Sequence, residues 1–283
     1  MADRVSLFRA GVAGLALMRL APDGSSAAIG VVLRALHHTL ERPEPLEPFL
    51  ERDPGAGYHE WALTYDQPGN PVIALEERVM VPLLDRLPPG DAIDVAAGTG
   101  RHASSLAAMG HRVLAIDASP AMLAGLRGRP GIETAVADLA ALPRPAASAD
   151  LVVCSLALTH VPVLEPAVRE LARVVRPNGR VIVSDVHPLI VALGGQAFYR
   201  TGEGAMRFVR NHVHWTSDYL AAFKAADLAV DACHEPRLRA ASGVPHFMEA
   251  PGAVEDAAGR IAFDGLPGVI VWELTQREAS RSV

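Results

Sequence analysis

The sequence predicts an α/β protein with a doubly wound, mostly parallel sheet of seven strands and a helical N-terminal cap. From residue 91 onward, short apolar runs alternate with amphipathic segments that have helical spacing. A glycine-bearing turn, "AAGTG" at residues 96–100, separates the first of these runs from the first helix. Half of the 283 residues are hydrophobic, which suffices for a full core. Because consecutive parallel strands need crossover helices, we expect helices on both faces of the sheet.

The first 57 residues are expected to form the helical cap, and residues 58–283 the main domain. Pro and Gly in "APDGSS" separate two predicted helices, residues 5–20 and 27–41. The stretch 41–57 is rich in Pro and acidic residues and is expected to be an extended connector.

The main domain begins with aromatic residues and then a predicted helix at 72–87, which has an apolar stripe. Seven apolar segments are predicted as strands: residues 91–96, 112–116, 132–137, 150–156, 180–185, 228–233 and 269–274. Helices are predicted between most of them, at residues 101–109, 120–127, 164–176 and 217–226. Two inserts interrupt the rhythm, at about residues 187–216 and 236–268, and both are expected on the acceptor side of the domain.

Composition excludes several classes of partner. The formal net charge is −6 and no Lys/Arg-rich run of five or more residues occurs, so we expect no nucleic acid partner. Apolar runs stay short of the roughly 18 residues that a membrane span requires. Arg9 interrupts the N-terminal apolar segment, so we expect no secretory signal and a cytoplasmic protein. Cys154 and Cys233 lack metal-ligand spacing and are expected to be buried, reduced thiols.

The glycine turn fits two different chemistries. Gly98, Gly100 and Ala103 satisfy the dinucleotide pattern G-x-G-x-x-A, with the acid Asp117 following the next predicted strand. Counted from Asp94, the same stretch is D-x-A-x-G-x-G. A carboxylate at that strand end would repel a pyrophosphate, whereas it would attract a ligand that carries an ammonium and a sulfonium. Asp94 therefore favours the second pattern.

Longer segments carry a family resemblance. The segments "AIDVAAGTGRHASSLAAMGHRVLAIDASPAMLAGLR", "AVADLAALPRPAASADLVVCSLALTHV" and "AVRELARVVRPNGRVIVSDVHP" resemble a class I methyltransferase dependent on S-adenosylmethionine (SAM) that acts on small molecules. The resemblance extends over about residues 58–235. It implies a Rossmann-like fold, SAM as cofactor, S-adenosylhomocysteine as product and methyl transfer as the reaction.

The resemblance also implies a set of cofactor-binding residues. Asp117 would bind both ribose hydroxyls, and Asp138 with the Leu139 amide would bind the adenine edge. The first glycine of the usual loop is an alanine here, which casts doubt on the backbone approach at that position alone. The remaining implied residues are Asp94, Ala96, Gly98 and Gly100 at the methionine end, together with Ala118, Met122 and Ser155.

Candidate catalytic residues lie after the strands, where the acceptor should bind. His160 and His187 follow the fourth and fifth predicted strands of the sheet, and a histidine has a pKa suited to proton transfer. Structural roles at the strand ends are the alternative for both. Glu170 is expected to be an ion-paired surface acid, yet it is a candidate base if carbon is methylated. Tyr65 is the first candidate for an aromatic ring over the methyl group.

Candidate acceptor-binding residues come from two aromatic stretches. "GYHEWALTYDQPGN" contributes Tyr58 and Trp61, and the insert at 194–220 is the most cationic and aromatic part of an acidic chain. If the middle of that insert is extended, Arg210, His212 and His214 share one face, which would suit an anionic acceptor or, less well, a metal. The insert candidates are Tyr199, Arg207, Arg210, His214 and Trp215.

Several alternatives stay open at this point. The acceptor could be a specialised metabolite, or an isoprenoid diphosphate or carboxylate that is methylated on carbon. A diphosphate could bring its own magnesium, although no protein metal site is predicted. A protein that binds SAM without methylating, or an NAD-dependent oxidoreductase, is a candidate from another class. The N-terminal helices could close the site or join two copies of the chain.

Overall fold

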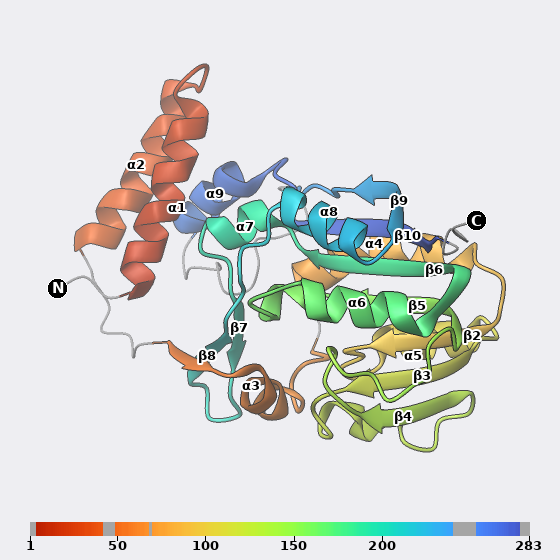
Figure 1. Cartoon of the computed structure of the whole chain (residues 1–283). Helices are drawn as coiled ribbons and strands as arrows, with labels where there is room; N and C mark the ends of the chain where they lie inside the picture. Colours follow the sequence, from red (N-terminus) through yellow and green to blue (C-terminus); the bar gives the residue numbers. More distant parts are fainter. Residues whose placement is uncertain (1–3, 42–48, 68–69, 240–252, 278–283) are drawn as a thin grey trace.

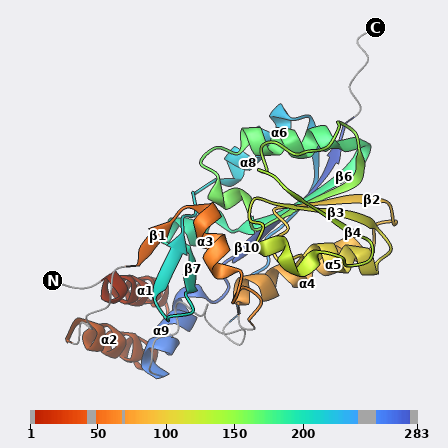
Figure 2. The same ribbon diagram turned by 90° about the horizontal axis from the view of Figure 1, so that it is seen from below.

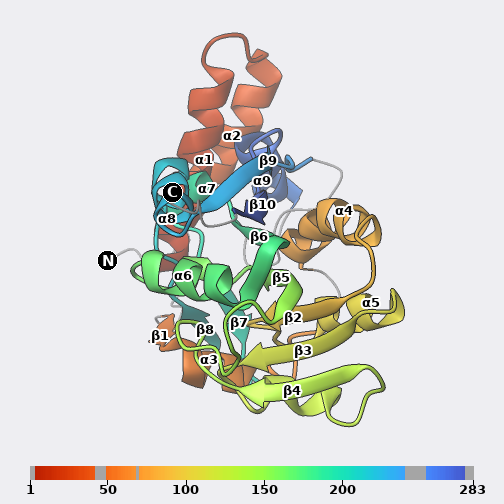
Figure 3. The ribbon, with the colours of Figure 1, turned by 45° about the vertical axis from the view of Figure 1, so that its right-hand side comes forward.

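The seven-stranded sheet has the order β4-β3-β2-β5-β6-β10-β9, which confirms the predicted doubly wound fold. The computed structural model describes residues 4–41, 49–67, 70–239 and 253–277. All neighbouring strands from β4 to β6 pair in parallel, and β10 is antiparallel to both β6 and β9. β4 and β9 form the two edges (Figure 3). The strands are β2 (Asp91–Val95), β3 (Arg112–Asp117), β4 (Ile132–Val136), β5 (Ala149–Ser155), β6 (Val175–Val186), β9 (Leu228–His234) and β10 (Val269–Gln276).

Helices cover both faces of this sheet (Figure 2). α4 (Pro71–Asp85) and α5 (Arg101–Ala108) lie on one side, while α6 (Glu165–Val174) and α8 (Thr216–Ala225) lie on the other. The chain reverses its direction of strand addition between β2 and β5. A doubly wound sheet binds its ligand at such a reversal, beyond the carboxyl ends of the strands.

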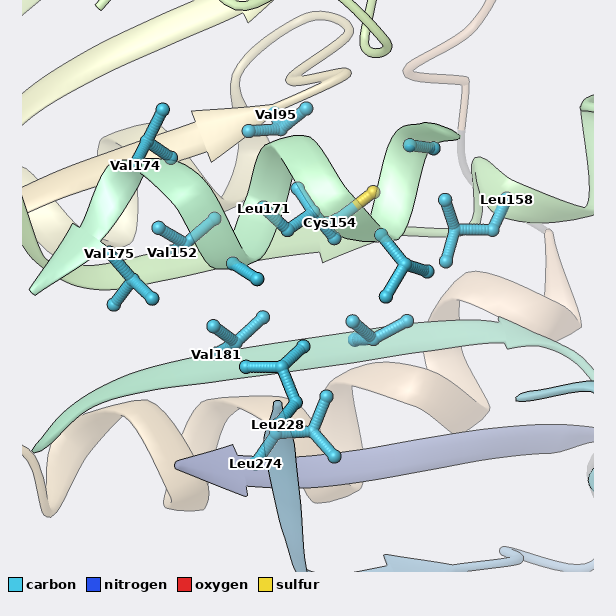
Figure 4. Packing of buried hydrophobic residues seen from close by; sticks show 14 of the residues in the cluster. Val95, Val152, Cys154, Leu158, Leu171, Val174, Val175, Val181, Leu228 and Leu274 are labelled. Carbon is cyan, nitrogen blue, oxygen red and sulfur yellow. The ribbon is translucent and has the colours of Figure 1, made fainter. Parts of the chain in front are cut away.

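The core is split between the two faces by the alternation of strand side chains. Val152 and Cys154 of β5 pack toward α6, together with Leu171 of that helix (Figure 4). Leu151 and Val153 of the same strand belong to the other cluster, with the side chains of α4 and α5. Because the middle of β5 is buried on both faces, residues 151–154 form a continuous apolar run.

The helical cap contains a segment from the C-terminal part of the chain. α1 (Arg4–Leu20) and α2 (Ser26–Glu41) form a hairpin that packs against α9 (Ala253–Phe263), as Figure 1 shows. Arg19 of α1 donates to the backbone carbonyls of Ala262 and Asp264 at 3.0 and 2.6 Å, which caps the end of α9. The insert predicted at 236–268 thus supplies a helix to the cap.

A three-stranded sheet lies beyond the carboxyl ends of the main sheet (Figure 1). Its order is β1-β8-β7, formed by β1 (Leu50–Arg52), β8 (Met206–Val209) and β7 (Ala197–Arg200). α3 (Pro54–Trp61) packs on it. The expectation of an extended connector up to residue 57 was wrong in this part, because Asp53 accepts from the Ala56 amide and starts a helix with Pro54 in its first turn.

Four other expectations need correction. The helix predicted at 164–176 ends at Val174, because Val175 already pairs with Ala149 in the sheet. The helix predicted at 120–127 is a 3₁₀ helix, η1 (Met122–Leu126), after which Gly128 takes a left-handed conformation. Residues 187–216 contain α7 (Pro188–Ala192) and the β7–β8 hairpin, and residues 210–215 form no strand. Cys154 is buried as expected, whereas Cys233 is exposed on the edge strand β9.

No helix in the described ranges combines the length and apolar character needed to cross a membrane. Those ranges also contain no group of three or more His, Cys, Asp or Glu side chains placed to hold a metal ion.

Candidate functional site

The glycine turn after β2 has the backbone conformation that its sequence requires. Ala96, Gly98 and Gly100 all have positive φ angles, of 54°, 57° and 86°. A side chain at Gly100 would collide with Leu126, whereas a Cβ at Gly98 would meet no atom within 4 Å. Ala96 stands in a left-handed conformation that glycine adopts more easily, so the predicted departure from the usual loop is accommodated with some strain. The turn therefore leaves open space at Gly98, where a ligand can approach the backbone.

Asp94 is buried beneath this turn with one oxygen unused. It is 2% exposed, and its Oδ2 has no hydrogen-bond partner among the described residues. Burial raises the pKa of this carboxyl to about 6, although the nearby His102 and the Ala103 amide act in the opposite direction. An unpartnered buried carboxylate oxygen is costly, and a cationic group of a ligand would offset that cost.

Asp117, at the carboxyl end of β3, links the glycine turn to the segment that follows β3. Its carboxylate accepts from the Gly98 amide and from the Ser119 amide, each at 2.8 Å. Burial raises its pKa, and these two amides oppose the shift. Each oxygen keeps a free lone pair, so the carboxylate can still accept from two hydroxyl groups of a ribose.

The other implied cofactor residues follow the same edge. Asp138 is exposed and accepts from the Ala140 amide at 2.7 Å, directly before the half-buried Leu139. Ser155 ends β5, and its hydroxyl is buried without a partner in the described part of the chain. Met122 is buried in η1, and Ala118 is exposed beside Asp117.

A fully buried glutamate supports the glycine turn from behind, and no pattern in the sequence indicates it. Glu76 of α4 is 0% exposed and accepts from Arg101 at 2.6 Å, from Ser184 at 2.8 Å and from His102 at 3.0 Å. Burial alone would raise the pKa of Glu76, but the hydrogen bonds and charges of His102 and Arg101 lower it to about 2. Arg101 and His102 form the first turn of α5, so an ionised Glu76 fixes the helix that follows the glycine turn.

Aromatic rings from α3 and its C-terminal loop gather at the same edge. Trp61 is stacked between Tyr58 and Tyr199, with centroid distances of 5.6 and 5.1 Å, and Tyr65 meets it edge-on at 5.1 Å. Tyr199 also donates to Glu60 at 2.9 Å. The structure thus brings together the predicted aromatic residues of two distant segments. The loop after α3 is joined to the glycine turn by a 2.7 Å hydrogen bond from the Thr99 hydroxyl to Asp66.

His160, in η2 (Leu158–His160) after β5, is bonded through both ring nitrogens. Its Nδ1 lies 2.9 Å from the Arg210 carbonyl oxygen, and its Nε2 lies 2.7 Å from the Tyr58 hydroxyl. Burial lowers the pKa of His160, and the charge of His212 lowers it further, against the effect of the Arg210 carbonyl. The ring is therefore neutral at neutral pH.

The other two acid–base candidates have structural partners. His187 caps α7 by accepting from the Leu189 amide, and its Nε2 donates to Glu235 at 3.0 Å. Glu170 accepts from Arg173 and from the Leu142 amide, as an ion-paired acid on α6. Neither contact places these groups at the aromatic cluster.

The cationic residues of the insert have separate environments. Arg210 is exposed and paired with Glu51, whereas His214 is buried and donates to the Val161 carbonyl at 2.7 Å. Trp215 is 52% exposed at the start of α8. Arg207 is half-buried, and its Nε is buried without a partner in the described residues. Of the three side chains expected on one face, the rings of His212 and His214 lie 6.4 Å apart, whereas Arg210 is turned to Glu51.

Asp185 is a second buried acid that the sequence did not reveal. It lies near the carboxyl end of β6, is 0% exposed, and accepts from the Tyr219 hydroxyl at 2.8 Å and from the Val186 amide at 2.9 Å. Burial raises its pKa to about 7, against the hydrogen bonds that it accepts. Its position could be found only from the packing of α8 against the strand.

These observations fit SAM better than a dinucleotide. The unused oxygen of Asp94 suits the ammonium group, the open space at Gly98 suits close approach of the methionine end, and Asp117 suits a ribose. A pyrophosphate at the same turn would lie near the carboxylate of Asp94, and the neighbouring cation Arg101 is already paired with Glu76 and Glu77.

Comparison with known proteins supports the same cofactor. Residues 93–183 match the family model of a methyltransferase domain. The chain is 37% identical over 113 residues to a demethylmenaquinone methyltransferase of Renibacterium salmoninarum, which covers 39% of this chain and less than half, 48%, of that relative. It is 26% identical over 235 residues to an uncharacterized methyltransferase of Emericella nidulans, covering 68% of this chain and 78% of the relative.

The fold also resembles solved structures. The [4+2]-cyclase SpnF superimposes with a TM-score of 0.59 at 19% identity, over 83% of this chain and 99% of the cyclase. Such low identity shows a common fold only. The matched model and the strand order together identify residues 93–183 as a methyltransferase domain within a sheet of the class I, Rossmann-like fold.

Proposed function

We propose that this protein transfers the methyl group of SAM to a small-molecule acceptor. The observation that carries the proposal is the group of Asp94, Gly98 and Asp117 at the carboxyl edge of the sheet, inside the matched domain. When bound there, SAM supplies an electrophilic methyl on a sulfonium. The acidic residues would hold its ammonium and ribose, while the glycine turn would receive its methionine carboxylate through backbone amides.

The protein would raise the rate by positioning the acceptor behind the methyl group and by excluding water from the site. Methyl transfer to a nucleophile is an in-line displacement, so the acceptor must be held behind the methyl. The aromatic cluster of Tyr58, Trp61, Tyr65 and Tyr199 is the surface that would exclude water there. A small acceptor of specialised metabolism in the cytoplasm is part of the proposal, because β7 and β8 of the first insert lie beyond the carboxyl ends of the strands, whereas α9 of the second insert joins the cap instead of the expected acceptor side.

An anionic acceptor, such as a carboxylate or an isoprenoid diphosphate, is a narrower version of this proposal. Arg207 supports it, since it is half-buried and makes no ion pair with the described residues. Arg210 supports it less, because Glu51 already neutralises it. Magnesium would enter only with a diphosphate. Changing Arg207 to Ala should then weaken acceptor binding and leave SAM affinity intact.

A SAM-binding protein that does not methylate is the second candidate. The observation that favours it is the fold shared with a [4+2]-cyclase, since the fold itself does not require methyl transfer.

Radiolabelled SAM separates the two candidates. The protein is incubated with SAM labelled in the methyl group and with a low-molecular-weight extract of the cells that produce it. We expect label in small molecules and an equal amount of S-adenosylhomocysteine, both abolished by Asp117→Ala. Asp150→Ala is the matched control. Asp150 also accepts from a backbone amide, that of Asp91 at 2.9 Å, but it lies at the amino ends of the strands, away from the proposed SAM site. SAM binding without release of S-adenosylhomocysteine would favour the second candidate.

A further inference from the structure

The hydrogen bonds of His160 determine which of its nitrogens carries the proton. The Arg210 carbonyl can only accept, so the Nδ1 that lies 2.9 Å from it must donate. In the neutral ring the Nε2 is then an acceptor, and it must receive its hydrogen bond from the Tyr58 hydroxyl 2.7 Å away. The direction of both hydrogen bonds follows from the chemistry of the carbonyl.

This direction limits what Tyr58 can do toward a ligand. A phenol has one hydrogen, and here that hydrogen is directed at His160. The oxygen of Tyr58 can therefore only accept from any other group beside it. An acceptor molecule next to Tyr58 must accordingly present a hydrogen-bond donor.

The Tyr58–His160 pair lies at the carboxyl ends of the strands, where the proposed SAM site is. Asp117 ends β3, and Asp185 lies near the end of β6. Burial raises the pKa of Tyr58 most, followed by Tyr65, and both aspartates are close enough to raise it further. The rings of Tyr58 and His160 meet in a T-shaped arrangement with centroids 5.3 Å apart, and Trp61 stacks on Tyr58 at 5.6 Å. The pair thus connects the carboxyl edge with the segment that follows β8.

We propose that Tyr58 and His160 form a proton relay, and that the methyl acceptor of this enzyme has a hydroxyl or N–H nucleophile. The inference rests on the proposed function. As the nucleophile forms its bond to the methyl carbon, the carbon–sulfur bond breaks and its electron pair stays on sulfur. The proton of the nucleophile moves to the oxygen of Tyr58 while the hydroxyl proton of Tyr58 moves to Nε2 of His160. The imidazolium that results still donates through Nδ1 to the Arg210 carbonyl.

The charged groups around the pair are compatible with this step. His212 lies on the segment after β8 and opposes a charge on His160, whereas Asp117 and Asp185 favour positive charge near Tyr58. The Arg210 side chain is turned to Glu51 and is thereby neutralised. Because burial lowers the pKa of His160, its base form is present at neutral pH and is lost only as the pH falls below the ordinary histidine range.

Nitrogen-15 NMR of histidine-labelled protein tests the hydrogen bonds without any acceptor. Comparison with His160→Gln assigns the signals of His160. The control is His59→Gln, which removes an exposed histidine next to Tyr58 on α3 and should leave those signals unchanged. We expect a neutral His160 protonated on Nδ1, with a pKa that rises in Tyr58→Phe because the donor to Nε2 is lost. A ring protonated on Nε2 would overturn the relay, because Tyr58 would then be the acceptor of that hydrogen bond.

The pH profile of methyl transfer tests the catalytic step. With the labelled SAM and cell extract described above, Tyr58→Phe and His160→Gln should lower the rate by about 10²-fold or more. At saturating SAM, which removes the effect of Asp94 on cofactor binding, the decline of rate at acidic pH should disappear in His160→Gln, while SAM affinity at neutral pH in both variants stays within about threefold of the wild type. Wild-type rates and an unchanged acid limb in both variants would overturn the relay. Absence of transfer by the wild-type protein would instead count against the proposed function, and the NMR result would be unaffected.

Discussion

At the residue scale, the buried Asp94 should make SAM binding depend on pH. Its carboxyl has a pKa of about 6, so it is largely protonated in mild acid and ionised at pH 7. The ionised form attracts the ammonium of SAM. We therefore expect the affinity for SAM to rise with pH through about 6 and to fall by up to about tenfold for each unit below it. Calorimetric titration at a series of pH values measures this dependence.

Two variants make the Asp94 prediction specific. Asp94→Asn should bind SAM weakly with little change between mild acid and neutral pH. Asp91→Asn is the control, because Asp91 lies on the same strand at its amino end and pairs with Arg112 and Arg176. It should keep the wild-type dependence. If Asp94→Asn retained the wild-type slope, another group would be responsible.

The acids near the glycine turn could be predicted, and the other buried acids could not. Asp94 and Asp117 stand at fixed places beside predicted strand ends, so the chain order reveals them. Glu76 depends on contacts 26 and 108 residues away along the chain, with His102 and Ser184. Its sequence context, an amphipathic helix, resembles that of any surface glutamate. Only the packing of α4 against the sheet distinguishes it.

At the element scale, α4 should stabilise the start of α5 through Glu76. Glu76→Ala would leave Arg101 and His102 partly buried without their shared carboxylate, so we expect a loss of about 3–5 kcal/mol in the free energy of unfolding. Glu77→Ala is the matched control, because Glu77 also contacts Arg101 but is 41% exposed; it should cost less than about 1 kcal/mol. Urea denaturation measures both. Equal losses in the two variants would refute the proposed role of Glu76.

The parallel part of the sheet was predictable because its elements are long and regular. Residues 91–186 alternate between buried strands and amphipathic helices, and their order is confirmed. The small sheet was not predictable, because β1, β7 and β8 have only three or four residues each and show no useful periodicity. The pairing of β1 with β8 joins segments more than 150 residues apart, and no local pattern indicates it.

At the scale of the whole molecule, the cap is assembled from both ends of the described chain. The sequence placed the cap in residues 1–57, whereas α9 joins α1 and α2 from the insert before the last strand. Arg19 is the polar link between them. Association of two copies through the N-terminal helices stays a prediction. The cap stands away from the carboxyl edge in Figure 1, and α3 with the small sheet covers that edge instead.

Calorimetric titration of the whole protein with SAM, S-adenosylhomocysteine and NADH tests the central claim most directly. We expect the two sulfur ligands to bind the wild type and Asp150→Ala equally well, and Asp117→Ala to bind neither. NADH should show no binding to any of the three proteins. Binding of NADH without binding of SAM would contradict the assignment of the glycine turn, and the proposed methyl transfer would fall with it.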